Sequence, residues 1–507
     1  MSAHTRLIIA TLMVAAFTIG TDFTGALLLV SAIEDDFGAD ITTTQWVLNI
    51  YAMTFSMFMV AGGRLGDMHG RRRLFLIGSV IFTVASTLCF LAPSIGWLIG
   101  ARALQGVGAA IMWPCILASG TTVVQEDQRG LVMGLILAGV TSGNVIGPLI
   151  SGVVVSVGDW RLFFLINAVL SVLGALMVVR YLPKDPARQL DERIDFAGMI
   201  VLSGAILTLL YALDVGADLG WLSPPIIGLL VLSALLFVFF LFIETRVADP
   251  TVPVQLMRNR EFLLTLSSNA FCVPAVFIAF LYFPQYLQKV LGWTILKASF
   301  GMLPLMLLLA VGSAVAGNFY ASLGPKRLML LGYSMIALGS ASVIIMEPSW
   351  GYFAILPALI LIGGGATMSV SPAGTATVSA VAQARAGLAG GLAFMVHLAF
   401  GAIGVAAATA VMFATSLATM RHNLAESGID ISSADKNVLN GRAFDSDAAR
   451  AVLARFNAED TEKIHSVLVD AFVRGMSLAY WLALVSAIVG LIVVIAIDEK
   501  KLRDVEG

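Results

Sequence analysis

The sequence predicts an all-α membrane protein with 14 transmembrane helices, arranged as two six-helix pseudo-symmetric halves plus two inserted helices. Three observations support this prediction: the composition, the length of the apolar runs and a repeated loop. Of the 507 residues, 59% are apolar and only 12% are charged. A soluble domain carries about 25% charged residues, so this chain has too little charge to cover several soluble domains.

The apolar residues are gathered into runs long enough to cross a bilayer. A transmembrane helix needs about 20 mainly apolar residues, and we count fourteen such runs. They lie near residues 7–30, 44–63, 74–94, 97–120, 131–157, 162–182, 195–214, 223–243, 262–288, 298–320, 327–346, 350–378, 386–416 and 471–497. The first run is not expected to be a cleaved signal peptide, because no small-residue cleavage site follows a short apolar core.

Composition and motifs also exclude several classes of function. The formal net charge of −2 argues against a nucleic-acid partner. Cys89, Cys115 and Cys272 all lie inside apolar runs, so a disulfide framework is not expected. The sequence contains no metal-ligand, nucleophile or phosphate-loop motif. We therefore expect no enzymatic activity, no cofactor, no metal site and no drive by ATP.

The distribution of Lys and Arg predicts the orientation in the membrane. With the N-terminus placed inside, 19 of the 30 basic residues lie on the inner side. The short outer loops hold only Arg161, Lys289 and Lys297. Since basic residues concentrate on cytoplasmic loops, both termini are expected in the cytoplasm.

A weak direct repeat indicates two halves. Gly63–Gly78 lies between runs 2 and 3, and Gly317–Gly332 lies between runs 10 and 11, at a constant offset of 254 residues with six identical positions. Parallel repeats are a signature of secondary transporters; the alternative is chance similarity between two Gly-rich basic loops. The expected division is 1–182 for the first half, 183–260 for two inserted helices and their linkers, and 261–507 for the second half with an extracytoplasmic loop at 417–470.

Four patches carry a family resemblance. They are the loop Gly63-x-Leu65-Gly66-Asp67-x-x-Gly70-Arg71-Arg72, the stretch Leu98-x-x-x-Arg102-x-x-Gln105-Gly106-x-Gly108-Ala109-Ala110, the stretch Gly143-x-x-x-Gly147-Pro148-x-x-Ser151-Gly152, and Asp22-Phe-Thr24. Together they resemble the major facilitator superfamily, specifically its fourteen-helix drug:proton antiporter branch. The chain departs from the branch pattern at Leu27, Ser31, Ala321, His397 and Leu398.

Asp22 and Arg102 are the charged residues placed deepest in the apolar runs. At 1.5 Å per residue, Asp22 lies about 12 Å and Arg102 about 8–12 Å below the outer ends of their helices. Their similar depth predicts an ion pair that takes part in proton coupling, with Gln105 one helical turn away. A charge at this depth costs roughly 2.5–3.5 kcal/mol on insertion scales, so it indicates function. The alternatives are an acid that caps a helix break near Gly20 and Gly25, or a fixed structural pair.

Two further motifs are expected to control the movement of the halves. Gly63, Asp67, Gly70, Arg71 and Arg72 are predicted to form an inner gate, with Asp67 meeting the N-terminal end of a neighbouring helix or an Arg and so locking the outward-facing state. The arginines alternatively serve as lipid and topology anchors.

The small residues of run 5 are expected to pack helices closely. The resemblance implies that they form an antiporter seal; generic close packing is the alternative. These residues are Gly143, Gly147, Pro148 and Gly152.

The remaining polar residues of the runs are candidates for a substrate cavity. His397 lies about 18 Å into run 13, near the midplane, and is either a proton or substrate contact or a satisfied core histidine. Abundant Phe and Met suit an adaptable apolar pocket, or simply face lipid. The predicted cavity residues are Gln105, Asn49, Tyr51, Asn269, Tyr282, Gln285 and Tyr286.

The segment 417–470 is the one soluble piece expected. Helical apolar spacing and a capping box at Asn457 and Asp460 predict a small helical cap over the outer mouth.

These features predict a proton-coupled exporter of amphipathic small molecules. Its expected setting is a bacterial inner membrane and its expected state a monomer, with a small-molecule substrate, protons and membrane lipids as partners. The alternatives are a dedicated exporter of one metabolite or lipid, and a membrane sensor that has lost transport.

Overall fold

The computed structural model describes the chain except residues 1, 40, 186–194, 248, 251, 253–255, 257, 294, 383–384, 428, 430, 433–451 and 500–507. Its regular secondary structure is helical, and no strand occurs among the described residues. Fourteen helices in this part of the chain are long and apolar enough to cross a membrane. The predicted fold class is confirmed, and the protein is a multi-pass membrane protein.

The spanning helices follow the order of the predicted runs. In the first part of the chain they are α1 (Ala3–Gly25), α3 (Ile41–His69), α4 (Arg71–Phe90), α5 (Ile95–Thr122), α6 (Glu126–Val157), α7 (Leu162–Tyr181), α8 (Phe196–Leu219) and α9 (Pro224–Glu244). In the second part they are α11 (Arg260–Phe271) with α12 (Val273–Lys289), α14 (Leu303–Leu323), α15 (Pro325–Ile344), α16 (Tyr352–Ser379), α17 (Ala386–Glu426) and α20 (Ala458–Ile495). Short helices α2 (Val30–Phe37) and α13 (Ile295–Gly301) lie between spans.

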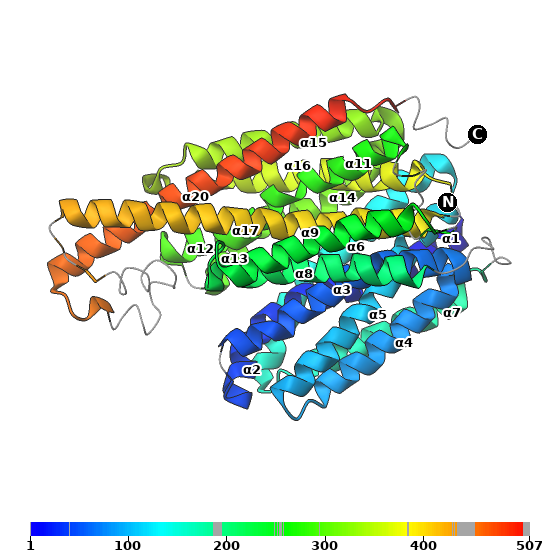
Figure 1. Ribbon diagram of the computed structural model, residues 1–507, viewed down its shortest axis with the longest axis horizontal. Helices are drawn as coiled ribbons and strands as arrows, with labels where there is room; N and C mark the ends of the chain where they lie inside the picture. Colours follow the sequence, from blue (N-terminus) through cyan, green and yellow to red (C-terminus); the bar gives the residue numbers. More distant parts are fainter. Residues whose placement is uncertain are drawn as a thin grey trace.

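The helices pack in two groups along the length of the molecule (Figure 1). Helices α1 and α3 to α7 pack on one another, and helices α11 to α17 pack with α20. Helix α8 packs against α3, α17 and α9. Most of α9 is exposed apolar surface, which suits a helix that faces lipid. The boundaries 1–182, 183–260 and 261–507 stay a proposal.

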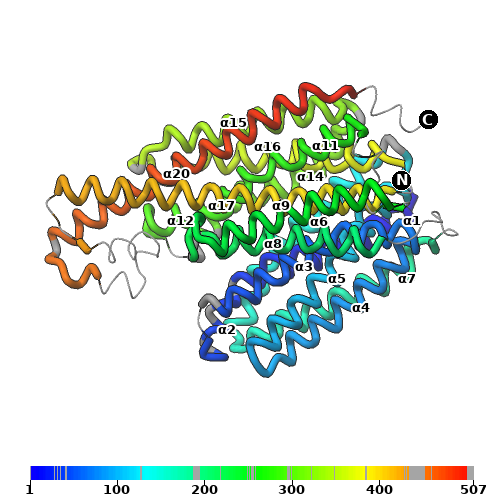
Figure 2. The backbone as a smooth tube through the Cα atoms, viewed as in Figure 1, coloured from blue at the N-terminus to red at the C-terminus, as the bar shows by residue number. Residues whose placement is uncertain are grey.

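The start of α1 and the end of α20 lie at the same end of the bundle, called here the terminal end (Figures 1 and 2). The two groups are in backbone contact toward this end: Gly63 on α3 packs against Gly387 on α17, and Gly134 on α6 packs against Ser313 on α14. Glycine allows such contact because it has no Cβ atom. At the opposite end, α2 and the start of α3 lie apart from α12 and α17 in the view of Figures 1 and 2.

Run 9 agrees with the spanning segment Arg260–Lys289. Within it α11 ends at Phe271 and α12 begins at Val273, with Pro274 in its first turn. The boundaries predicted for 417–470 need correction. The described parts of 417–470 mostly continue the neighbouring spans: α17 runs on to Glu426 and α20 begins at Ala458.

The small helical cap expected over the outer mouth stays a proposal, because residues 428, 430 and 433–451 lie outside the described residues. The two extensions project beyond the bundle (Figure 1), and their apolar residues form a small core of their own. The expected cap at Asn457 is present, since the Asn457 side chain accepts the N–H of Asp460. The predicted stretch from Ala449 lies partly outside the described residues.

Candidate functional site

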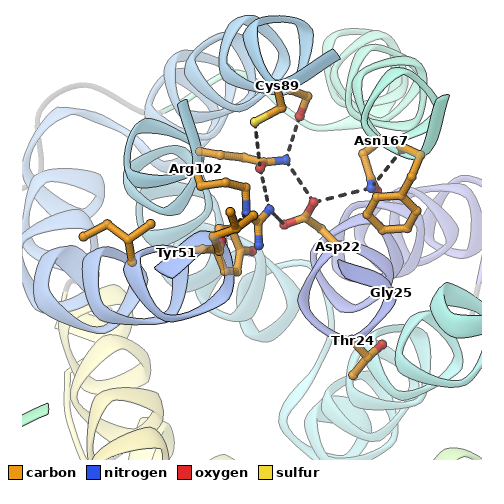
Figure 3. Close-up of polar contacts among 12 residues, drawn as sticks. Asp22, Thr24, Gly25, Tyr51, Cys89, Arg102 and Asn167 are labelled. Atoms are coloured by element: carbon orange, nitrogen blue, oxygen red, sulfur yellow. Dashed lines mark hydrogen bonds and ion pairs between the residues drawn. The ribbon is translucent and has the colours of Figure 1, made fainter. Parts of the chain in front are cut away.

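Asp22 on α1 and Arg102 on α5 form an ion pair inside the first group of helices (Figure 3). Arg102 Nη1 lies 2.7 Å from Asp22 Oδ2, and the two side chains are 1% and 0% exposed. Arg102 Nε also donates to the Val47 carbonyl on α3 at 3.0 Å. A buried charge needs both a partner and further hydrogen bonds, and this pair has both.

A polar network surrounds the carboxylate. Gln105, one turn after Arg102, donates from Nε2 to Asp22 Oδ1 at 3.0 Å and to Ser86 Oγ on α4 at 2.8 Å. Its Oε1 accepts from Arg102 Nη1 at 2.6 Å. Asn167 on α7 donates to Asp22 Oδ1 at 3.4 Å. Four helices of one group therefore contribute to one network around Asp22.

The Tyr51 ring covers the guanidinium of Arg102. The Arg102 Cζ atom lies 4.2 Å from the centre of this ring, within the range of a cation–π contact. Tyr51 is 1% exposed and Gln105 is 0% exposed, so in this conformation both residues belong to the buried network and neither faces the space between the two groups.

Close packing of α1 on α6 positions Asp22. A Cβ atom added at Gly143 would lie 2.8 Å from the Thr21 nitrogen, and one at Gly147 would lie 2.5 Å from the Thr21 oxygen. Thr24 adds a hydrogen bond to the Asn144 carbonyl at 2.9 Å. Gly152, in contrast, has open space where its side chain would be. The run 5 motif thus fixes the helix segment that carries Asp22.

Asp67 joins the two groups at the terminal end. Its carboxylate accepts the N–H of Gly387 at 3.0 Å and of Leu388 at 2.8 Å, in the first turn of α17. Arg71 forms an ion pair with the same carboxylate at 3.0 Å. A helix N-terminus carries partial positive charge and free N–H groups, so the anionic side chain of one group holds the α17 end of the other.

The neighbouring Arg72 is held by a residue that the sequence analysis did not select. Asp185, after α7, accepts the backbone N–H groups of Arg72 and Arg73 at 2.9 and 3.0 Å. It therefore caps α4, and its side chain packs on Gly70, whose φ of 100° favours glycine. Glu499 packs on Gly324 at the matching position of the repeat, before α15. One acidic residue therefore contacts each copy of the repeated loop: Asp185 contacts the first copy and Glu499 the second.

His397 lies among aromatic rings between the groups. Its imidazole stacks on Phe394 of α17, with centres 5.4 Å apart and planes 8° apart, and Phe277 of α12 meets it edge-on at 6.0 Å. His397 is half-buried. Phe394 also contacts Phe55 on α3 and Trp113 on α5, at 5.7 and 4.6 Å between ring centres. This aromatic cluster joins the two groups.

Asn49 and Gln285 are half-buried and have polar neighbours. Asn49 donates to both carboxylate oxygens of Asp214 on the inserted helix α8, at 2.8 Å. Gln285 accepts from Lys289 Nζ at 3.1 Å.

The other predicted cavity residues are buried in helix packing. Tyr282 donates to Thr409 Oγ1 at 3.1 Å and Tyr286 to the Gly351 carbonyl at 3.2 Å, so both hydroxyls are satisfied inside the second group. Asn269 donates to the Ala393 carbonyl at 3.3 Å.

The sequence analysis missed Ser86, Asn167, Asp185 and Asp214. Asn167 and Asp214 could have been noticed, because a polar side chain in or at the end of an apolar run needs a partner. Ser86 could not have been recognised as a site residue from the sequence, because serine is common in membrane helices.

A bundle of fourteen spanning helices with an ion pair buried in one group is the architecture of a polytopic transporter. Residues 12–405 match the model of the Major Facilitator Superfamily, and the chain belongs to this family of transporters.

Its relatives include proteins named for drug resistance. The puromycin resistance protein pur8 of Streptomyces alboniger is 33% identical over 78% of this chain and 79% of its own length. The multidrug resistance protein Stp of Mycobacterium tuberculosis (strain H37Rv) is 28% identical over 91% of this chain and 86% of its own length.

Solved structures share the fold. The proton:xylose symporter XylE, bound to 6-bromo-6-deoxy-D-glucose, matches 99% of this chain and 97% of its own chain with a TM-score of 0.62 at 14% identity. At this identity the likeness concerns the fold alone.

Proposed function

We propose that the protein is a proton-coupled antiporter that exports amphipathic small molecules, in particular drugs and other xenobiotics, by alternating access. The single observation that carries this proposal is the buried Asp22–Arg102 pair, 2.7 Å between Nη1 and Oδ2. The names of the relatives, which include puromycin and multidrug resistance proteins, support the substrate class.

The carboxylate of Asp22 can couple two transport events because it has competing partners. A proton on Asp22 removes the attraction for Arg102, and the freed guanidinium then changes its contacts with Gln105 and Tyr51. A membrane potential of 100 mV supplies about 2.3 kcal/mol per charge moved, which corresponds to a concentration ratio of roughly 50.

The conformation, closed at the terminal end, is the one expected of an exporter when it releases its substrate on the outer side. The terminal end is closed by Asp67 and by the contact of Gly63 with Gly387. Basic residues concentrate at this end, so we assign it and both termini to the cytoplasm of a bacterial cell, with the protein in the inner membrane. On this assignment we infer that the conformation is outward-facing and that Gly63, Asp67, Gly70, Arg71 and Arg72 form the inner gate.

The test is substrate-induced proton movement in proteoliposomes with a trapped pH-sensitive dye. Addition of ethidium, puromycin or other amphipathic compounds is expected to move protons only where the protein is present. A response to a single compound of a broad panel would instead indicate a dedicated exporter. Binding of compounds without any proton or substrate movement would contradict transport and indicate a sensor.

A further inference from the structure

Trp113 on α5 carries a buried hydrogen-bond donor that has no acceptor among the described residues in the present conformation. The residue is 0% exposed and is the largest fully buried side chain. Its indole Nε1 has no hydrogen-bond partner among the described residues. A donor buried without an acceptor costs free energy, so it needs an explanation. What distinguishes Trp113 from other such groups is the ring that covers it.

The ring that covers Trp113 comes from the other group of helices. Phe394 on α17 lies 4.6 Å from Trp113 between ring centres, with the planes tilted by 49°. Phe55 on α3 contacts the same Phe394 ring at 5.7 Å. Phe394 is therefore wedged between two helices of the first group, although its own helix belongs to the second.

The wedge lies next to the contact that closes the terminal end. Phe394 is about 12 Å along α17 from the helix start, and Trp113 is about 14 Å from the end of α5 on the same side. The start of α17 is held by Asp67 through Gly387 and Leu388. Opening of the terminal end, which moves α17 away from α3 and α5, must withdraw Phe394 from Trp113.

We propose that Trp113 donates its indole N–H to a hydrogen-bond acceptor on the exported molecule when the terminal end is open, and that Phe394 takes the place of this molecule when the end closes. This inference rests on the proposed export function, and it makes the ligand an aromatic amphiphile with a carbonyl, ether or ring-nitrogen acceptor. The indole N–H of Trp113 is then accessible to the ligand when the terminal end is open, and Phe394 covers it when the terminal end is closed.

The surroundings of Trp113 fit such a ligand. Phe394 presents an aromatic face to the indole, and His397 stacks on Phe394 with planes 8° apart, so the space that Phe394 occupies already fits a flat ring. Aromatic rings favour offset or tilted contacts with one another. A flat ligand in the place of Phe394 would keep the aromatic contacts, and the hydrogen bond requires that its acceptor extend past the ring to the edge of the indole that carries Nε1.

The experiment compares Trp113→Phe, which removes the N–H but keeps a ring, with Trp160→Phe. Trp160 is a matched control, because it is also buried and its Nε1 also lacks a partner among the described residues. It lies in a different cluster, against Phe37 and Phe164. The probes are puromycin, which carries ether, amide and ring-nitrogen acceptors, and ethidium, whose ring system offers neither carbonyl nor ether oxygen.

Binding of both probes is measured with the full-length protein in detergent. Trp113→Phe is expected to lower the affinity for puromycin several-fold, up to about tenfold, and to leave that for ethidium within about twofold. Trp160→Phe is expected to leave both unchanged. Equal losses for both probes, or no loss for puromycin, would overturn the assignment of Trp113. Wild-type protein that binds neither probe would instead contradict the proposed function.

A spectroscopic measurement covers the case in which Trp113→Phe does not fold. The wild-type protein is labelled with 5-fluorotryptophan, and the resonances of the other seven of its 8 tryptophans, Trp160 included, are assigned by single substitutions to Phe. The remaining resonance is then that of Trp113, and no Trp113 variant is needed. Puromycin is expected to shift the fluorine resonance of Trp113 and to leave that of Trp160 in place. A Trp113 resonance that puromycin does not move would overturn the inference.

Discussion

Asp22 is stable inside an apolar helix because its carboxylate has partners on two other helices. Arg102 and Gln105 reach it from α5, and Asn167 reaches it from α7. These donors replace the water that the carboxylate loses on burial. Removal of one partner is then more costly than removal of the whole pair, because it leaves a single charge buried.

This reasoning predicts the order of stability among variants of the pair. Arg102→Ala is expected to destabilise the protein by about 3–5 kcal/mol, since it leaves Asp22 buried without its partner. The double variant with Asp22→Asn and Arg102→Gln should be more stable than Arg102→Ala, because it buries no charge. Thermal unfolding in detergent measures this order; a double variant with the lower midpoint would contradict the account.

For a single residue, the sequence predicts its depth along a helix better than the direction in which its side chain points. The matched depths of Asp22 and Arg102 predict their meeting, since 1.5 Å per residue fixes position along a helix. Tyr282 and Tyr286 were expected in a cavity, yet their hydroxyls bond inside the second group. Their helix is apolar on most of its surface, so periodicity does not tell which face meets the cavity.

Helix α17 is held at its start by Asp67. This contact joins the two groups through two hydrogen bonds to one buried carboxylate. Asp67→Asn weakens two charge-assisted hydrogen bonds and removes the ion pair with Arg71. We expect the population to shift toward opening of the terminal end. Spin labels at the exposed positions Gln125 and Arg327, in a variant without native cysteines, should report longer distances.

Ser94→Ala is the matched control for this measurement. It removes the cap of α5, a contact within the first group and away from the terminal end, so it should lower stability by about 0.5–2 kcal/mol without changing the distances. Equal shifts in both variants would mean that Asp67 acts through general stability and not as a gate.

The contact between α1 and α6 makes a second prediction at this scale. Gly147→Ala must move α1, because the added Cβ atom would lie 2.5 Å from the Thr21 carbonyl oxygen, next to Asp22. We expect a loss of stability of about 1–3 kcal/mol and a loss of pH-driven efflux. Gly152→Ala meets open space and should be neutral in both assays; a neutral Gly147→Ala would contradict a role of this packing.

Helices α17 and α20 extend beyond the run boundaries predicted near residues 416 and 471. Hydropathy alone ends run 13 near residue 416, but Met420 and Leu424 belong to the same buried cluster as Ile464 and Leu468 of the facing helix. The apolar stripes of the two extensions cover one another, together with Ile431 and Val452, so both helices continue beyond the apolar runs. The sequence shows both stripes, but it does not show that they face one another.

The two groups of helices are related by a sequence repeat, but they differ in the charged residues that they bury. The repeat at an offset of 254 residues indicates two related halves, and fourteen long apolar helices follow from composition and run length. The buried Asp22–Arg102 pair lies in the first group of the described structure, whereas the offset of 254 residues places the uncharged Val276 on α12 and Leu356 on α16 at the corresponding positions of the second group. We therefore place the proposed proton coupling in the first group of helices.

The most direct test of this assignment is proton-coupled efflux by Asp22→Asn in proteoliposomes, measured with a pH gradient and a trapped dye. The account predicts that this variant inserts and still binds substrate, but moves neither protons nor substrate in response to the gradient. Asp36→Asn is the control, because Asp36 forms an ion pair with Arg161 that is partly exposed, and it should transport as the wild type does. Proton-driven efflux that persists in Asp22→Asn would contradict the central claim.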